Sequence, residues 1–172
     1  MWIAVVCLFA LAILTLLSSL YALAVTGVPV LRTPAIALDE LVEALGDVQP
    51  ALIVDAGCSD GRSLRRLCRA TGAPGRGYEL NGFVWLWAWL RARLFVWDCK
   101  LSIRWADYRR ADFEGVDLVY AFLMPSAMRL LGEKCQEEMA EGTLLVSLMW
   151  PVPDWEPVRT CELGPRKDPL YF

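Results

Sequence analysis

The sequence contains no histidine. This excludes Ser-His-Asp and Cys-His catalytic sites, and every metal motif that needs an imidazole ligand. The six cysteines include no C-x-x-C pair, which argues against zinc, and they are too scattered for a disulfide framework in 172 residues. A net charge of -3 gives no strong field that would indicate nucleic acid as a partner. We therefore expect reduced thiols, no metal and no nucleic acid.

Charged side chains are also absent from Trp2 to Val30. As a helix, the apolar run from Trp2 to Val25 would reach about 36 Å, enough to cross a hydrocarbon core of about 30 Å. A cleaved signal peptide is the alternative, because Ala22-Leu23-Ala24 resembles a cleavage site, but the run is long and no basic residue precedes it. We expect a single-pass membrane anchor over residues 1–30. Arg32 is the first basic residue, so the positive-inside rule places the rest on the cytoplasmic or mitochondrial matrix side.

Beyond the anchor, short apolar runs alternate with amphipathic segments. A linker and a helix are expected over residues 31–48, and one domain over residues 49–172. Strands are predicted at 51–57, 76–80, 101–107, 116–123 and 143–149, helices at 62–71, 81–95 and 126–140, and two short strands within 156–172. This alternation predicts an α/β, Rossmann-like fold with a mostly parallel sheet, helices on both faces and a C-terminal β-hairpin.

The stretch "LIVDAGCSDGRS", residues 52–63, follows the first predicted strand of this domain. Its Gly57-Cys58-Ser59-Asp60-Gly61 matches the G-x-S-x-G nucleophile elbow, but a serine nucleophile needs a histidine base that this chain lacks. A P-loop would need a lysine here, and an NAD fingerprint would need glycine in place of Arg62. What fits is Asp55 followed by small residues at alternate positions, with Glu79 at the end of the second strand. Small residues let backbone amides approach a nucleotide-like cofactor, and a carboxylate about twenty residues on can accept two ribose hydroxyls.

This spacing resembles that of the class I S-adenosylmethionine-dependent methyltransferases. Four segments in order, "VDAGCSDGRS", "GYELNGFVWLWAWLRARL", "AFLMPSAMRLLGEKCQEEM" and "MWPVPDWEP", further resemble a family of small membrane-anchored methyltransferases. That family includes mitochondrial protein-lysine methyltransferases of the ATP synthase c subunit and the adenine nucleotide translocase. The likeness covers roughly residues 36–163 and the placement of the anchor. It implies a class I methyltransferase domain, S-adenosylmethionine as cofactor, and a lysine of a membrane protein at the membrane surface as substrate.

The resemblance also assigns site residues. The cofactor-binding residues it implies are Asp55, Gly57, Ser59, Gly61, Glu79 on the ribose and Asp107 facing the adenine. It places Leu123, Met124 and Pro125 beside the transferable methyl group. Aromatic and apolar side chains of Tyr120, Phe122, Met124 and Trp150 would lower the pKa of an acceptor lysine by desolvation. Methyl transfer is an in-line displacement that needs alignment, so no catalytic acid or base is required.

Several alternatives stay open. Ser59 replaces the middle glycine of the family pattern and, at positive φ, costs on the order of 1 kcal/mol, which leaves room for a non-catalytic binding module. The aromatic-rich helix 81–95 suits a lipid or other hydrophobic small molecule as methyl acceptor. Its tryptophans are expected to lie mostly in the core, with some at the bilayer interface. Glu79 is expected in an open crevice, where its removal would change stability little.

Overall fold

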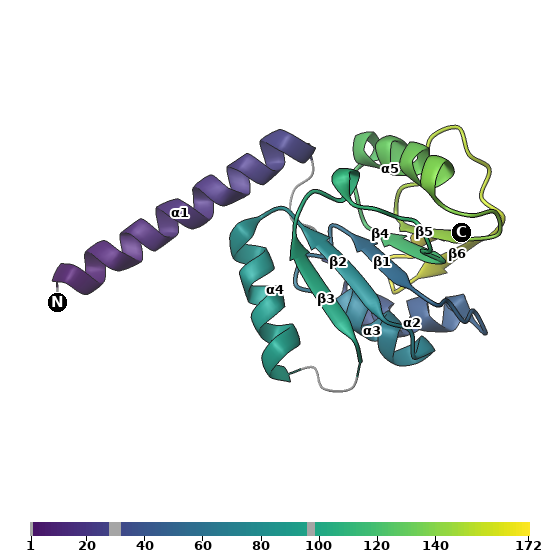
Figure 1. Cartoon of the computed structure of the whole chain (residues 1–172), viewed down its shortest axis with the longest axis horizontal. Coiled ribbons are helices and arrows are strands. Elements are labelled where there is room, and N and C mark those ends of the chain that lie inside the picture. The colour runs from purple at the N-terminus through teal and green to yellow at the C-terminus, as the bar shows by residue number, and fades with distance from the viewer. Residues whose placement is uncertain (1, 28–31, 96–98) are drawn as a thin grey trace.

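A computed structural model describes residues 2–27, 32–95 and 99–172 and contains a seven-stranded sheet (Figure 1). The strands are β1 (Ile53–Ala56), β2 (Gly75–Glu79), β3 (Leu101–Trp105), β4 (Leu118–Ala121), β5 (Leu144–Leu148), β6 (Thr160–Leu163) and β7 (Asp168–Tyr171). Their order is β3-β2-β1-β4-β5-β7-β6, with β1 to β5 parallel and the terminal hairpin antiparallel. The predicted α/β fold class is confirmed.

The central strands β1 and β4 are buried at every position. Their near-continuous apolar sequences are typical of parallel strands covered on both faces. Strand order reverses between β1 and β4, and at such a switch point the loops leaving the carboxyl ends of the strands open a crevice in which ligands bind. The glycine-rich loop, residues 55–61, leaves β1 at this point.

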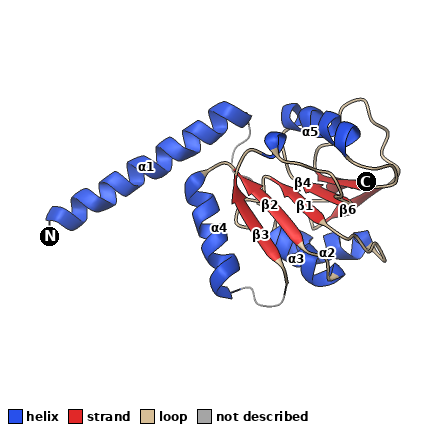
Figure 2. Ribbon diagram, viewed as in Figure 1, coloured by secondary structure: helices blue, strands red, loops and turns tan. Residues whose placement is uncertain are grey.

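Helices cover both faces of the sheet (Figure 2). They are α2 (Ala35–Leu45), α3 (Arg62–Thr71), α4 (Gly82–Phe95) and α5 (Pro125–Glu138), with a short 3₁₀ helix η1 (Tyr108–Arg110). One core joins α2, α3 and α4 to the sheet and includes Leu41, Leu64 and Ile53. The other joins η1 and α5 to the opposite face and includes Tyr108, Met128 and Val119.

Helix α1 (Trp2–Thr26) projects away from the domain (Figure 1). Among the described residues it is the one helix long and apolar enough to cross a membrane, judged by length and composition alone. Its C-terminal part touches the domain, because Ser18 donates a hydrogen bond to Asn81 at 3.0 Å and Arg109 donates one to the Val25 carbonyl at 3.2 Å. Ala22 is the buried residue of α1.

The expectation that the tryptophans of the second helix lie mostly in the core is wrong for α4. Ala88 is its buried residue, Trp85 and Trp89 are half-buried, and Trp87 is 54% exposed. The small Ala88 side chain lets α4 approach the sheet closely, so the bulky side chains turn sideways or outward. Trp97 lies outside the described residues.

Candidate active site

The glycine-rich loop makes a tight turn that three left-handed residues support. Gly57 has φ 84°, Ser59 has φ 48°, and Gly61, at the N-cap of α3, has φ 76°. The amides of Gly57 and Cys58 both donate to the Tyr78 carbonyl, at 3.0 and 2.9 Å. A Cβ on Gly57 would stand 3.0 Å from Leu123 Cδ2, so only glycine fits there without displacing that side chain.

The carboxylate of Glu79 holds the loop to the end of β2. Its Oε2 accepts the Ser59 amide at 3.0 Å, and its Oε1 accepts the Asn81 amide at 2.8 Å. Burial raises the pKa of Glu79, and these amide hydrogen bonds oppose the rise. With 8% exposure, Glu79 is not in an open crevice, so the expectation that its removal would change stability little is wrong.

Asp55 lies at the end of β1 and is 2% exposed. Burial, with the nearby Glu79 carboxylate adding to it, raises the pKa of Asp55 to about 8, while the backbone amide of Leu64 opposes the rise. Two carboxyl groups therefore share the base of the loop, and Asp55 holds a proton at neutral pH.

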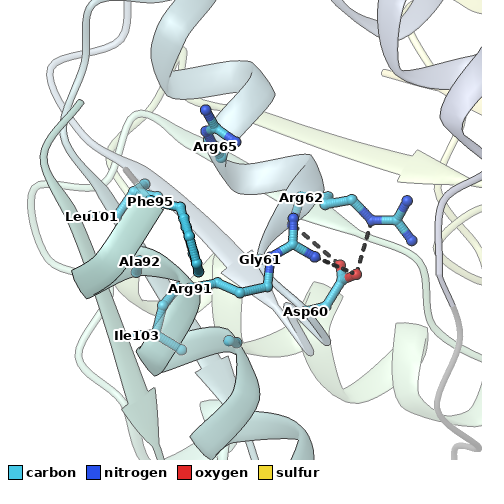
Figure 3. A pocket seen from close by; sticks show the side chains of 10 residues that line it. Asp60, Gly61, Arg62, Arg65, Arg91, Ala92, Phe95, Leu101 and Ile103 are labelled. Carbon is cyan, nitrogen blue, oxygen red and sulfur yellow. Dashed lines mark hydrogen bonds and ion pairs between the residues drawn. The ribbon is translucent and has the colours of Figure 1, made fainter. Parts of the chain in front are cut away.

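Asp60 joins the loop to two helices, as Figure 3 shows. Its carboxylate pairs with Arg62 of α3 at 2.8 Å and with Arg91 of α4 at 3.3 Å. Gly61, rather than Asp60, occupies the N-cap position of α3, although Asp60 Oδ1 accepts the Arg62 amide at 3.3 Å. The ion pairs fix the far side of the loop against the helix layer.

Asp107 follows β3, as predicted, and caps η1. Burial acts to raise its pKa, but hydrogen bonds and charge from Arg109 prevail, so the pKa of Asp107 is lowered. The closest of these contacts, from Arg109 Nη2 to Asp107 Oδ2, is 2.6 Å. Its expected role facing an adenine stays a prediction.

The substrate-side residues follow β4 and β5, whose carboxyl ends are adjacent. Phe122, Met124 and Trp150 are half-buried at this edge, Leu123 is buried, and Pro125 is exposed at the start of α5. Tyr120 differs from them, because it is 1% exposed and its hydroxyl lies 2.7 Å from that of Thr33. The strand ends bring together the residues assigned to the methyl and the acceptor, except that Tyr120 is turned into the domain.

Two polar contacts were not predicted from the sequence. Asn81 is 1% exposed, and its side chain accepts the Phe83 amide at 3.1 Å and donates to Ser19 of α1 at 2.9 Å. Asparagine directly before an apolar run is an N-cap signal that could have identified it. Thr33 also accepts a hydrogen bond from Ser63 at 3.0 Å, which links the linker to α3 through side chains that no sequence pattern marks.

A nucleoside cofactor fits this chemistry. The Ser59 hydroxyl is buried and has no hydrogen-bond partner among the described residues, so it remains available to a polar ligand. Each Glu79 oxygen accepts one amide and retains acceptor capacity for a hydroxyl. Neither Cys58 nor Tyr120 offers a nucleophile or base at neutral pH, because burial raises the pKa of both.

The strand order, the loop after β1 and the acid after β2 define a class I methyltransferase domain. Residues 55–159 match the model of the ANTKMT methyltransferase domain. The chain belongs to this family, as predicted.

Two curated relatives are lysine methyltransferases. The chain is 37% identical over 117 residues to the adenine nucleotide translocase lysine N-methyltransferase of Mus musculus, covering 64% of this chain and 48% of the relative. It is 31% identical over 114 residues to the lysine N-methyltransferase of the ATP synthase c subunit of Rattus norvegicus, covering 65% and 51%. The chain thus spans about half the length of the curated relatives it matches.

A solved structure matches more of the chain. An RNA methyltransferase from Salinibacter ruber, in complex with S-adenosyl-L-homocysteine, superposes with a TM-score of 0.72 at 28% identity. The match covers 82% of this chain and 91% of that one. A methyltransferase from Thiobacillus denitrificans, also with S-adenosyl-L-homocysteine, has a TM-score of 0.57 at 20% identity, covers 67% of this chain and 48% of that one, and supports the fold alone.

Proposed function

We propose that this protein is an S-adenosylmethionine-dependent methyltransferase that methylates a lysine side chain of a membrane protein. The observation that carries the cofactor assignment is the Glu79 carboxylate bound to the Ser59 amide, because it places a ribose acceptor beside the loop. The match to two lysine N-methyltransferases carries the acceptor assignment.

Cofactor binding would use the glycine-rich loop, Glu79 and Asp107. When bound, S-adenosylmethionine supplies an electrophilic methyl group on a sulfonium. The bare backbone at Gly57 and the unpaired Ser59 hydroxyl allow the loop to contact the ligand closely. The crevice at the switch point orients it across β1 and β4.

The acceptor lysine must reach the site as a neutral amine. Phe122, Met124 and Trp150 supply apolar surface at the ends of β4 and β5, and desolvation there lowers the pKa of an amine. Alignment of the amine with the methyl then accounts for the rate, in keeping with the raised pKa of Cys58.

Helix α1 serves as a single-pass anchor in this proposal. It has 25 residues without a charged side chain, and no described residue before Ser18 hydrogen-bonds to the rest of the domain. The domain then faces the cytoplasm or the mitochondrial matrix, with its acceptor at the membrane surface. The separation into an anchor, a linker with a helix, and a domain over residues 49–172 remains part of the proposal.

The test is methyl transfer from radiolabelled S-adenosylmethionine by the purified full chain mixed with membrane fractions. We expect label in protein, recovered as methylated lysine after acid hydrolysis. Label that solvent extraction removes would instead identify a lipid acceptor, and no transfer to any fraction despite cofactor binding would favour a non-catalytic module.

RNA is a second candidate acceptor, because the Salinibacter ruber protein that matches over 82% of this chain is an RNA methyltransferase. The same experiment with added RNA separates the two. Label released by ribonuclease, with none in protein, would replace the lysine proposal.

A further inference from the structure

The outer surface of α4 is apolar although no part of the described chain covers it. Positions at helical spacing along this side form what we call the outward stripe: Phe83, Leu86, Trp87, Leu90 and Leu94. The structure exposes Trp87 by 54% and Leu94 by 56%. The opposite side carries Ala88 against the sheet and Arg91 paired with Asp60 (Figure 3). A helix that is apolar on both sides is typical of burial in protein or lipid.

The length of α1 indicates which of these applies. Its C-terminal part is fixed to the domain, since the Ser18 hydroxyl accepts the Gly82 amide at 3.1 Å and Asn81 donates to Ser19 at 2.9 Å. Residues 2–17 alone would span about 24 Å, less than a hydrocarbon core of about 30 Å. If α1 crosses a bilayer, the part of the domain beside Ser18 must lie at its boundary. That part is the start of α4.

The charges around α4 suit a lipid surface. Between residues 82 and 105 the described charged side chains are all basic: Arg91, Arg93, Lys100 and Arg104. Amphipathic helices at bilayer surfaces combine an apolar face with flanking arginine and lysine, and tryptophan is favoured at this depth. A second copy packed through the same stripe would instead bring like charges of the two copies together.

We propose that the outward stripe of α4 lies in the headgroup–acyl boundary of the bilayer that α1 crosses. The inference rests on the proposed anchoring by α1 and extends it to a second contact. Helix α4 lies on the side of the domain from which α1 projects, and the two diverge from the point where they touch (Figure 1). The domain would thus be held at a fixed orientation, and its acceptor would be limited to groups near the membrane surface.

Photocrosslinking of the full chain in phosphatidylcholine–phosphatidylglycerol vesicles tests this. The variants carry p-benzoylphenylalanine at Leu86 or Leu94, both exposed, so that either suffices if the other fails to fold. Glu137, exposed on α5 across the sheet, is the matched control, and Leu11 reports on the anchor itself. We expect lipid adducts at Leu86, Leu94 and Leu11, and their loss at Glu137.

Each other outcome separates this inference from the function on which it rests. Lipid adducts at Leu11 without any at the stripe would overturn the contact by α4 and leave the anchor in place. Crosslinks from the stripe to a second copy would show a dimer contact instead. Lipid adducts at the stripe but none at Leu11 would retain the contact by α4 and refute the anchor. None of these results depends on methyl transfer.

Discussion

Replacing Glu79 with alanine removes the acceptor of two backbone amides, those of Ser59 and Asn81. A buried donor left without a partner costs about 1–3 kcal/mol, so Glu79→Ala should lower the free energy of unfolding by at least that amount. If the carboxylate also accepts ribose hydroxyls, the loss of charge-assisted hydrogen bonds should weaken S-adenosylmethionine binding about tenfold or more. By linkage, a tenfold loss of affinity reduces the stabilisation by saturating ligand by about 1.4 kcal/mol.

The assay is denaturant unfolding with and without S-adenosylmethionine. The control is Val54→Ala, which should cost about 1–3 kcal/mol through a cavity in β1 while the ligand still stabilises the fold fully. Val54 is completely buried and its side chain is no part of the loop. An unchanged ligand-dependent stabilisation in Glu79→Ala would refute the assignment of the ribose acceptor.

Three further changes probe the loop. Gly57→Ala places a Cβ 3.0 Å from Leu123 at φ 84°, and denaturant unfolding should show a loss of about 1–2 kcal/mol or more. Ser59→Ala removes a buried hydroxyl without a partner, so it should raise stability by up to about 1 kcal/mol while calorimetry shows weaker cofactor binding. The pKa of Asp55 is about 8 in the folded protein against an ordinary 3.8, so the folded state keeps a proton that the unfolded state releases. The free energy of unfolding should therefore fall as the pH rises from 4 to 8, and Asp55→Asn should flatten this dependence in unfolding curves measured across that range.

The sequence predicted the sheet well because its central strands are buried on both faces. Short apolar runs such as residues 51–57 have few alternatives to a parallel strand when glycine and proline bound them. The glycine-rich loop could be located for the same reason, since it must follow the first strand of the domain. Positive φ at Ser59 was predicted as a consequence of its place in the pattern, and the structure has it at 48°.

Other features depend on contacts between distant segments. The burial of Glu79 follows from the path of the loop above it, and the orientation of Tyr120 follows from Thr33, 87 residues earlier. The outward tryptophan of α4 was misassigned because a helix that is apolar all round carries no pattern that distinguishes its two sides. The contact between Ser18 and Asn81 is equally invisible to local patterns.

Calorimetric titration of the folded full chain with S-adenosylmethionine tests the central claim most directly. The glycine-rich loop and the Glu79 carboxylate predict saturable binding, which should be markedly weaker in Glu79→Gln, where one of the two acceptor oxygens becomes a donor. Absence of binding by a protein whose unfolding curve shows an intact fold would contradict the account.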